Sequence, residues 1–375
     1  MRKLFLGCVA ACLLIPPLYG LVARAPQQTD NRVLAAAPAF PSSLNDLVVW
    51  PRAVDSFLND HFGLRSHFIE GDTLLHWRLF GNSSNKQVVV GNSDRLFFWD
   101  GDVPFRTLLG NCGAWWSGQM RDMFARDDEQ ALTRFDELIP NLTILVIPTS
   151  SALYQSEFPE WIKSACRGHS LLVDDLLAHL PRLHSTRVIY PTDIAGSLPA
   201  PLIPKHNFHW AGRGIEFLFD RLVAILTLTR QASPTWVTIT QPSDLARYAP
   251  GVGLSNQLEA PQWNAQFCTA QDCMGPIRDL KVPFETFTVV RPGDGGKLLL
   301  LSDSFGSGAA SSLIGFFSQI IDINLNNFGT MSPGERRQLW IRLMYEWKPD
   351  RVYLVLNDGN FPGMLRFANL IPDAQ

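Results

Sequence analysis

The sequence predicts an α/β fold with a parallel sheet of about five strands, covered by helices on both faces. Two observations lead to this prediction. Short apolar runs recur along the chain, and segments with helical spacing of apolar residues separate them. Continuous apolar runs are typical of strands buried on both faces, and strands that alternate with helices imply a parallel sheet between helical layers. The runs that predict the strands are 144–148, 187–190, 298–301, 320–325 and 352–356.

The helices expected around these strands cover 117–139, 170–180, 211–228, 309–317 and 333–347. Before them, apolar residues three and four apart predict two helices, from Trp50 to Phe62 and across 68–79, and then two short strands at 88–90 and 96–99. The Pro- and Gly-rich interval 229–296 is interpreted as an insertion beside the sheet. We therefore expect residues 49–375 to form one domain.

The N-terminus is typical of an exported protein. Arg2 and Lys3 precede an apolar stretch that covers residues 4–23, as in a signal peptide, and the stretch is also long enough to span a bilayer. Residues 1–25 are therefore either a cleaved signal or an N-terminal membrane anchor, and Pro26 directly after Ala23-Arg24-Ala25 favours the anchor. Residues 26–48, rich in Ala, Pro and Gln, read as a linker. Both alternatives place the body outside the cytoplasm, and we expect a periplasmic protein tethered to the inner membrane.

Charge and cysteine content narrow the function classes. The net charge is −3 and no block of Lys and Arg occurs, which argues against a nucleic-acid partner. Four cysteines lie in the body, an even number that suggests disulfides in an oxidising compartment. We expect Cys268 to pair with Cys273, and by elimination Cys112 to pair with Cys166. A zinc site at the C-x4-C spacing, or free buried thiols, are the alternatives.

A candidate nucleophile lies where the apolar run 297–301 meets the turn Ser302-Asp303-Ser304-Phe305-Gly306. Such a turn places Ser304 at the carboxyl end of a central strand, where open α/β sheets bind ligands. The N–H groups of the following helix could hold an oxyanion beside it. An ordinary strand–turn–helix with small turn residues is the alternative interpretation.

A candidate base lies in the segment Lys205-His206-Asn207-Phe208-His209-Trp210. A serine nucleophile needs a base, usually His, and the base needs an orienting group. We assign His209 as the base and Asn207 as the orienting residue. The alternatives are a His packed at the start of a helix and an H-x-x-H metal pair with His206, although no third ligand lies nearby. We expect no metal and no cofactor.

These segments resemble the alginate O-acetyltransferase family (AlgJ/AlgX-like) of the SGNH hydrolase superfamily. The similar stretches are 57–65 with 88–97, Asn207-Phe208-His209-Trp210 in the place of Asp-x-His-Trp, and Ser302-Asp303-Ser304-Phe305 in the place of Gly-Asp-Ser-Phe. The resemblance covers about residues 50–360. It implies an SGNH-like three-layer fold and acetyl transfer to a polysaccharide hydroxyl.

The resemblance also implies roles for individual residues and for a partner. Ser304 would carry the acetyl group as an ester, and His209 would deprotonate Ser304 and then the acceptor hydroxyl. Trp210 and Phe305, within the same two motifs, are expected to bind substrate. A membrane-bound O-acyltransferase would supply the acetyl group.

The sequence departs from the family at Asn207, where the family has the orienting Asp. Asn can hold the His tautomer but cannot neutralise an imidazolium, and Asp-to-Asn in a serine protease triad lowers turnover about 10,000-fold. Asp303 should point away along its strand, and Asp193 and Asp358 are unranked alternatives. The leading hypothesis is an exopolysaccharide O-acetyltransferase. A carbohydrate acetylesterase with the same residues and a catalytically degenerate polysaccharide-binding or assembly subunit are the alternatives.

Overall fold

The computed structural model describes residues 35–61, 64–99, 108–114, 116–180, 183–269 and 277–372, and five isolated residues before residue 20. These residues form two compact units. One unit contains residues 1–85 and 246–254, and the other contains residues 86–245 and 255–375. Apart from those isolated residues, the N-terminal apolar stretch lies outside the described residues, as does Cys273. No helix among the described residues is long and apolar enough to cross a membrane.

The first unit is built on two helices, α2 (Leu44–Asp60) and α3 (Arg65–Phe80), with the short helix η4 (Ala246–Tyr248). A capping box starts α2, because Ser43 Oγ accepts the Asp46 N–H and the Asp46 carboxylate accepts the Ser43 N–H. The expected linker to residue 48 therefore overlaps a helix that begins four residues earlier. Gly81 ends α3 with a φ of 62°, a conformation that glycine adopts without strain.

A seven-stranded sheet forms the centre of the second unit, in the order β4-β3-β11-β9-β10-β8-β7. The first five strands are parallel and match the five predicted from the sequence, while β8 and β7 extend one edge in antiparallel fashion. The strands are β3 (Thr143–Ile147), β4 (Arg187–Ile189), β7 (Gln266–Thr269), β8 (Phe287–Val290), β9 (Lys297–Ser302), β10 (Gln319–Asn324) and β11 (Arg351–Asn357).

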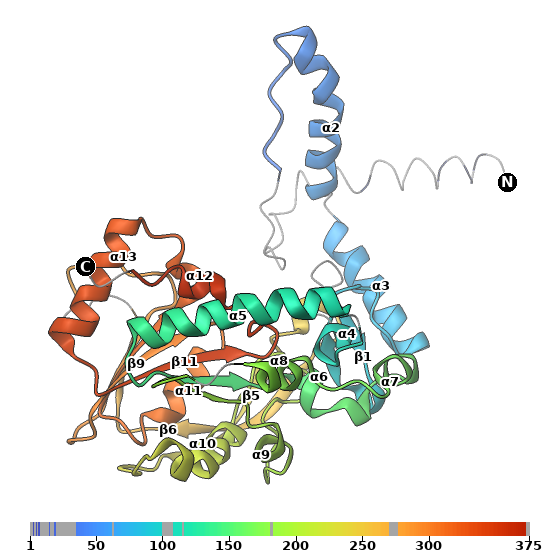
Figure 1. The fold of residues 1–375 in the computed structure, drawn as a ribbon. Helices are drawn as coiled ribbons and strands as arrows, with labels where there is room; N and C mark the ends of the chain where they lie inside the picture. The colour runs from blue at the N-terminus through green and yellow to red at the C-terminus, as the bar shows by residue number, and fades with distance from the viewer. Residues whose placement is uncertain are drawn as a thin grey trace. The chain divides into compact units, whose positions relative to one another are not determined.

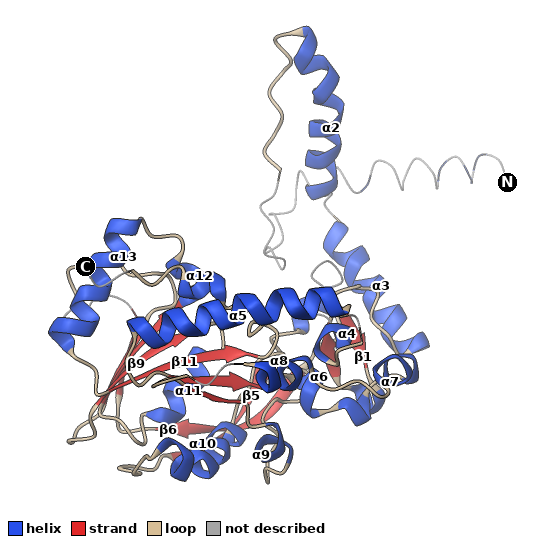
Figure 2. Cartoon of the chain, viewed as in Figure 1, coloured by secondary structure: helices blue, strands red, loops and turns tan. Residues whose placement is uncertain are grey.

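Alternate side chains of each central strand enter two separate cores. In β9, Leu299 and Leu301 pack under α5 (Gly118–Leu138), α8 (Leu172–His179) and α13 (Pro333–Ile341). Leu298 and Leu300 face the opposite core with α10 (Arg213–Leu226) and α11 (Gly306–Leu313). Figures 1 and 2 show α5 and α10 on opposite sides of the strands. Because a strand projects side chains alternately to its two faces, runs without polar residues require this double cover. The predicted three-layer α/β fold is thus confirmed.

The interval 229–296, expected beside the sheet, has two roles. It forms a separate antiparallel hairpin of β5 (Thr235–Pro242) and β6 (Ser255–Gln262), and it supplies the two antiparallel edge strands β7 and β8 of the main sheet. The shorter elements are β1 (Val88–Val90), η1 (Asn92–Asp94), β2 (Leu96–Phe98), α4 (Leu108–Asn111), α6 (Ser150–Leu153), η3 (Gln155–Glu157), α7 (Glu160–Cys166), α9 (Thr192–Gly196), α12 (Leu325–Phe328), η6 (Arg342–Trp347) and α14 (Leu365–Ala368).

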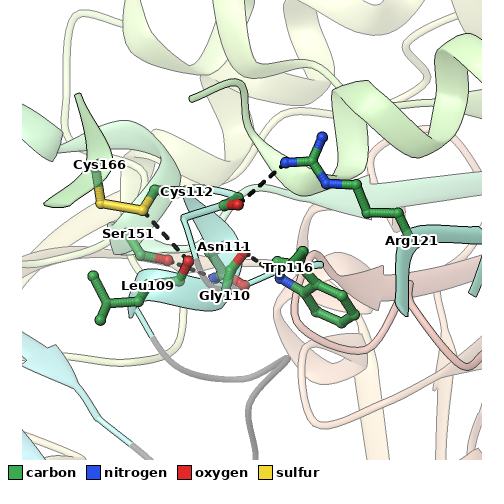
Figure 3. The surroundings of a disulfide bond; sticks show 9 residues. Leu109, Gly110, Asn111, Cys112, Trp116, Arg121, Ser151 and Cys166 are labelled. Carbon is green, nitrogen blue, oxygen red and sulfur yellow. Dashed lines mark hydrogen bonds between the residues drawn. A yellow bond between two sulfur atoms is a disulfide. The ribbon is translucent and has the colours of Figure 1, made fainter. Parts of the chain in front are cut away.

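A disulfide joins Cys112, which follows α4, to Cys166 at the end of α7, 54 residues later. Figure 3 shows the hydrogen bonds that hold its surroundings, among them Trp116 Nε1 to the Gly110 carbonyl at 2.8 Å. The prediction of this pair by elimination is confirmed. Cys268 is also disulfide-bonded.

Candidate functional site

A cavity of about 460 Å³ opens at the carboxyl ends of β9 and β10. One wall is the β5–β6 hairpin, with Ile239 and Leu258, and the other is the start of α11, with Ser307 and Ser311. Ser304 lies on its surface. The cavity therefore occupies the position at which ligands bind to open α/β sheets.

The turn after β9 holds Ser304 exposed while its neighbours are buried. Asp303 fixes this turn, because its carboxylate accepts the Phe305 N–H at 2.9 Å, the Asn357 N–H at 2.8 Å and the side-chain amides of Asn357 and Asn360, each at 2.7 Å. Burial raises the pKa of Asp303, and hydrogen bonds from Asn360, Asn357 and Phe305 oppose that rise. Asp303 therefore holds the backbone of the turn, and its carboxylate bonds Phe305, Asn357 and Asn360 rather than His209.

Ser304, His209 and Asp244 form a continuous series of hydrogen bonds. Ser304 Oγ lies 2.9 Å from His209 Nε2, and His209 Nδ1 lies 2.7 Å from Asp244 Oδ2. A carboxylate can only accept, so Nδ1 carries the proton and Nε2 is free to accept the Ser304 O–H. The carboxylate also accepts the backbone N–H groups of Phe208, at 2.8 Å, and His209, at 2.9 Å. This is the arrangement of nucleophile, base and acid that activates a serine.

Trp210 joins the segment that carries His209 to the turn that carries Ser304. Its Nε1 donates to the Phe305 carbonyl at 2.8 Å, and its ring approaches α11 so closely that a Cβ at Gly308 would lie 2.3 Å from Nε1. Position 308 therefore requires glycine. The contact joins the two sequence motifs, since the residue after His209 bonds the residue after Ser304.

Trp210 and Phe305, the two residues expected to bind substrate, differ in their positions. Trp210 lines the cavity although only 4% of it is exposed. Phe305 is fully buried, and its ring lies behind His209, with the ring centres 5.0 Å apart. Trp210 is thus placed to contact a bound molecule, whereas Phe305 supports the imidazole from the core.

Asn207 lies close to His209 but does not occupy the place expected for it. Asn207 was expected beside His209 as the orienting residue, but Asp244 contacts the His209 Nδ1 atom. The Asn207 side chain instead accepts hydrogen bonds from the Asp244 N–H and from Asn256. The reason is that the carboxylate approaches from the loop after β5, where its two oxygens fill the space around the imidazole.

The other acids considered from the sequence lie elsewhere. Asp358 is buried and bonds the Thr149 N–H at 2.9 Å and the Tyr190 hydroxyl at 3.2 Å, and burial raises its pKa to about 6. Asp193 is exposed on α9. Neither residue bonds His209, so Asp244 alone among the acids discussed reaches the base.

Asp244 could not be predicted from the sequence, because no local signal marks it. It follows Gln241-Pro242-Ser243 in a polar turn, 35 residues from His209. Asp is common in turns for local reasons. Only the position of the hairpin brings this carboxylate to the imidazole.

The lining of the cavity contains further carboxylates. Asp322 is buried, and burial raises its pKa to about 7, with the nearby Asp303 and Glu285 charges contributing. Its Oδ1 accepts the Ser302 hydroxyl at 2.6 Å, and Asn324 Nδ2 donates to Glu285 at 2.7 Å. Among the described residues that line the cavity, His209 is the single basic side chain. The described part of the chain contains no cluster of three His, Cys, Asp or Glu side chains able to hold a metal.

Comparison with known proteins gives the fold. Neither a protein-family model nor a curated protein matches the sequence. Among solved structures, a DHHW family protein from Eubacterium siraeum matches with a TM-score of 0.52 and 12% identity, over 77% of this chain and 96% of that one.

PatB1 of Bacillus cereus matches with a TM-score of 0.45 and 10% identity, over 74% of this chain and 98% of the other. The O-acetyltransferase domain of Pseudomonas putida AlgJ matches with a TM-score of 0.39 and 13% identity, over 73% and 92%. At 12% identity, the match to the DHHW family protein shows similarity of fold alone, so the function must be argued from the site.

Proposed function

We propose that the protein is an O-acetyltransferase of the AlgJ/AlgX-like kind, which acetylates a hydroxyl of an extracellular polysaccharide through an acetyl-Ser304 intermediate. The observation that carries the proposal is the series Ser304–His209–Asp244 at the surface of a cavity. Each member has the contact that its role needs: the nucleophile touches the base, and the base touches an acid.

The reaction proceeds in two steps. In the first, His209 Nε2 takes the Ser304 proton while Oγ attacks the acetyl carbonyl of the donor, and the same proton passes to the leaving group as acetyl-Ser304 forms. In the second, His209 takes the proton of the acceptor hydroxyl, whose oxygen attacks the ester, and Ser304 leaves with that proton. Asp244 stabilises the imidazolium in both steps.

The start of α11 supplies groups that could stabilise the tetrahedral intermediates. Ser307 and Gly308 lie in its first turn and line the cavity. The first N–H groups of a helix have no acceptor within the helix, and they are favourably placed to donate to an oxyanion. The Gly306 N–H is already bonded to the Asp303 carbonyl, so this role falls to the groups after it.

The lining of the cavity favours an uncharged acceptor. Its volume is that of a small-molecule site and leaves room for more than an acetyl group. Its described lining contains acidic side chains, Glu285 and Asp244 among them, but no Lys or Arg, and a uronate would meet like charges without a compensating Lys or Arg. We therefore expect a neutral oligosaccharide to remove acetyl from Ser304 faster than a uronate oligosaccharide does. A faster uronate reaction would contradict this choice of acceptor.

The location and the partner are part of the proposal. The basic and apolar N-terminal stretch supports a protein held at the inner membrane with its body in the periplasm. Acetyl groups would then have to cross the membrane, which supports a membrane-bound O-acyltransferase as the donor.

Hydrolysis by the same residues is the second candidate. Ser304 is exposed, so water can reach an acetyl-enzyme, and the protein would then act as an acetylesterase. The third possibility, a degenerate binding or assembly subunit, depended on the missing acid at position 207. Asp244 removes that reason.

The test is trapping of the acyl-enzyme. The full-length protein in detergent is mixed with p-nitrophenyl acetate, quenched in acid and analysed by intact mass and peptide mapping. We expect one acetyl group on Ser304 and none in Ser304→Ala. An unmodified wild type, or an acetyl group that persists in Ser304→Ala, would refute the proposal.

A further inference from the structure

The acid and the base of the site lie on separate segments of the chain. His209 lies in the segment before α10, and Asp244 follows β5 by two residues. Both side chains are about one-third exposed, so core packing alone does not fix them. Some other contact must hold the two segments at hydrogen-bonding distance.

Two buried amides supply such a contact, beside the hydrogen bond from the Ser243 hydroxyl to the His206 carbonyl. Asn207 Oδ1 accepts the Asp244 N–H at 3.3 Å and Asn256 Nδ2 at 2.8 Å. Asn256, on β6, in turn accepts the His206 N–H on its Oδ1 at 3.4 Å. Asn207 is 5% exposed and Asn256 is 8% exposed. Buried amides of this kind are costly to leave unpaired, so their bonds are held.

The backbone N–H donors determine which side-chain atom of Asn207 and of Asn256 is the oxygen and which is the nitrogen. A backbone N–H can only donate, so the Asp244 N–H requires the oxygen of Asn207 to face it. Asn256 must then present its NH₂ group to that oxygen, and its own oxygen is left to face the His206 N–H. All three contacts agree with this single orientation.

We propose that Asn207 and Asn256 are positioning residues, an amide clamp that holds Asp244 against His209. This inference rests on the proposed function of that pair. The clamp is reciprocal, because the Asn207 side chain bonds the backbone of Asp244 while the Asp244 side chain bonds the backbone of Phe208 and His209. Position 207 therefore acts through the acid and does not replace it.

The clamp also explains why position 207 is an amide. A carboxylate there could accept the same two donors, but its negative charge would lie beside that of Asp244. Two like charges in one site disfavour each other's ionised form. With the acid supplied by the hairpin, an uncharged acceptor serves best at position 207.

The test compares Asn256→Ala with a matched control, Asn111→Ala. Asn111 is also 8% exposed and also bonds through its side-chain amide, to Thr149 and Ser151, away from the cavity. We expect Asn256→Ala to lower kcat for p-nitrophenyl acetate about ten- to a hundredfold, with KM nearly unchanged. We expect Asn111→Ala to keep the wild-type kcat.

A spectroscopic signal reports the clamp without activity. The His209 Nδ1–H that Asp244 accepts should give a low-field proton resonance, absent in His209→Gln. We expect Asn256→Ala to weaken or broaden it and Asn111→Ala to keep it. An unchanged resonance and kcat in Asn256→Ala would overturn the proposal, as would equal losses in Asn111→Ala. If the wild type forms no acyl-enzyme, the proposed function fails, and the resonance alone decides the clamp.

An exchange of the two residues gives the second test. The double variant Asn207→Asp with Asp244→Asn moves the acid to the position expected from the sequence. Because Asn207 bonds Asp244 and Asn256 rather than His209, we expect no recovery over Asp244→Asn alone. Recovery to the wild-type rate would show that position 207 can hold the acid, and would overturn the assignment of a purely positioning role.

Discussion

Replacing Asp244 by Asn should nearly abolish acylation of Ser304. The carboxylate accepts three hydrogen bonds, from Phe208 N–H, His209 N–H and His209 Nδ1. An amide has one oxygen, so its NH₂ group must face at least one of these donors. The imidazole is then free to take the tautomer that cannot accept the Ser304 proton, and the imidazolium loses its counter-charge.

The size of the effect follows from the geometry. Opposite charges about 3 Å apart attract by roughly 5 kcal/mol at an effective dielectric constant of about 20, which corresponds to about 10,000-fold in rate. His209 and Asp244 are 34% and 31% exposed, so water weakens the attraction and this value is an upper limit. We expect Asp244→Asn to lower kcat by about 1,000- to 10,000-fold, with KM little changed.

The assay is the burst of p-nitrophenol under single-turnover conditions, with intact mass to quantify acetyl-Ser304. Asp193→Asn, an exposed acid on α9, is the matched control and should keep the wild-type rate. A loss of less than tenfold in Asp244→Asn would refute the reasoning, since an orienting acid cannot be removed at so small a cost.

Three further predictions concern stability and the joining of the motifs. Burial raises the pKa of Asp128 to about 8. The folded protein should therefore lose stability as the pH rises from about 4 to about 8, because the unfolded chain releases this proton more readily. In urea unfolding at pH 7, the free energy of unfolding of Asp128→Asn should exceed that of the wild type by about 4 kcal/mol. A disulfide that closes 54 residues should contribute about 4 kcal/mol, so replacing both Cys112 and Cys166 by Ala should lower the urea midpoint. Gly308→Ala should lower the acylation rate about tenfold or more, because the added Cβ displaces Trp210.

Each of these predictions has a contrary outcome. The stability difference between wild type and Asp128→Asn should shrink as the pH falls from 7 to 4. Equal free energies of unfolding at pH 7 would contradict the raised pKa of Asp128. A urea midpoint that is unchanged by loss of the disulfide would contradict the expected loss of unfolded-chain entropy on closing the bridge. A Gly308→Ala protein with normal acylation would mean that the Trp210 ring can move without disturbing His209.

Much of the fold could be predicted because its signals are local. The five parallel strands contain short apolar runs, and the residues of the central strands β3, β9, β10 and β11 are mostly buried, whereas the edge strand β4 is partly exposed. The antiparallel edge strands β7 and β8 were not predicted, because they are short and lie in a Pro- and Gly-rich interval. The strands with which they pair depend on how the rest of the sheet is arranged, which their own residues do not indicate.

The positions of two residues of the candidate site, Ser304 and His209, could also be predicted from the sequence. The strand–turn–helix pattern places Ser304 at the end of β9, and His209-Trp210 precedes a helix, so both segments carry their own structural signals. The structure brings Ser304 and His209 to 2.9 Å. Asn207 was expected to orient the base in the place of the acid, because it lies two residues from His209 within the same motif.

The sequence by itself determined which strands and helices form, which serine is exposed at the end of a strand, and which histidine stands before a helix. These follow from spacing within a few residues. Only the tertiary structure decided that Asp244 meets the imidazole and that Asn207 holds Asp244. The hydrogen bonds involved reach about 3 Å, while the residues they join are 35 and 37 positions apart, so the contacts exist only once the hairpin has docked.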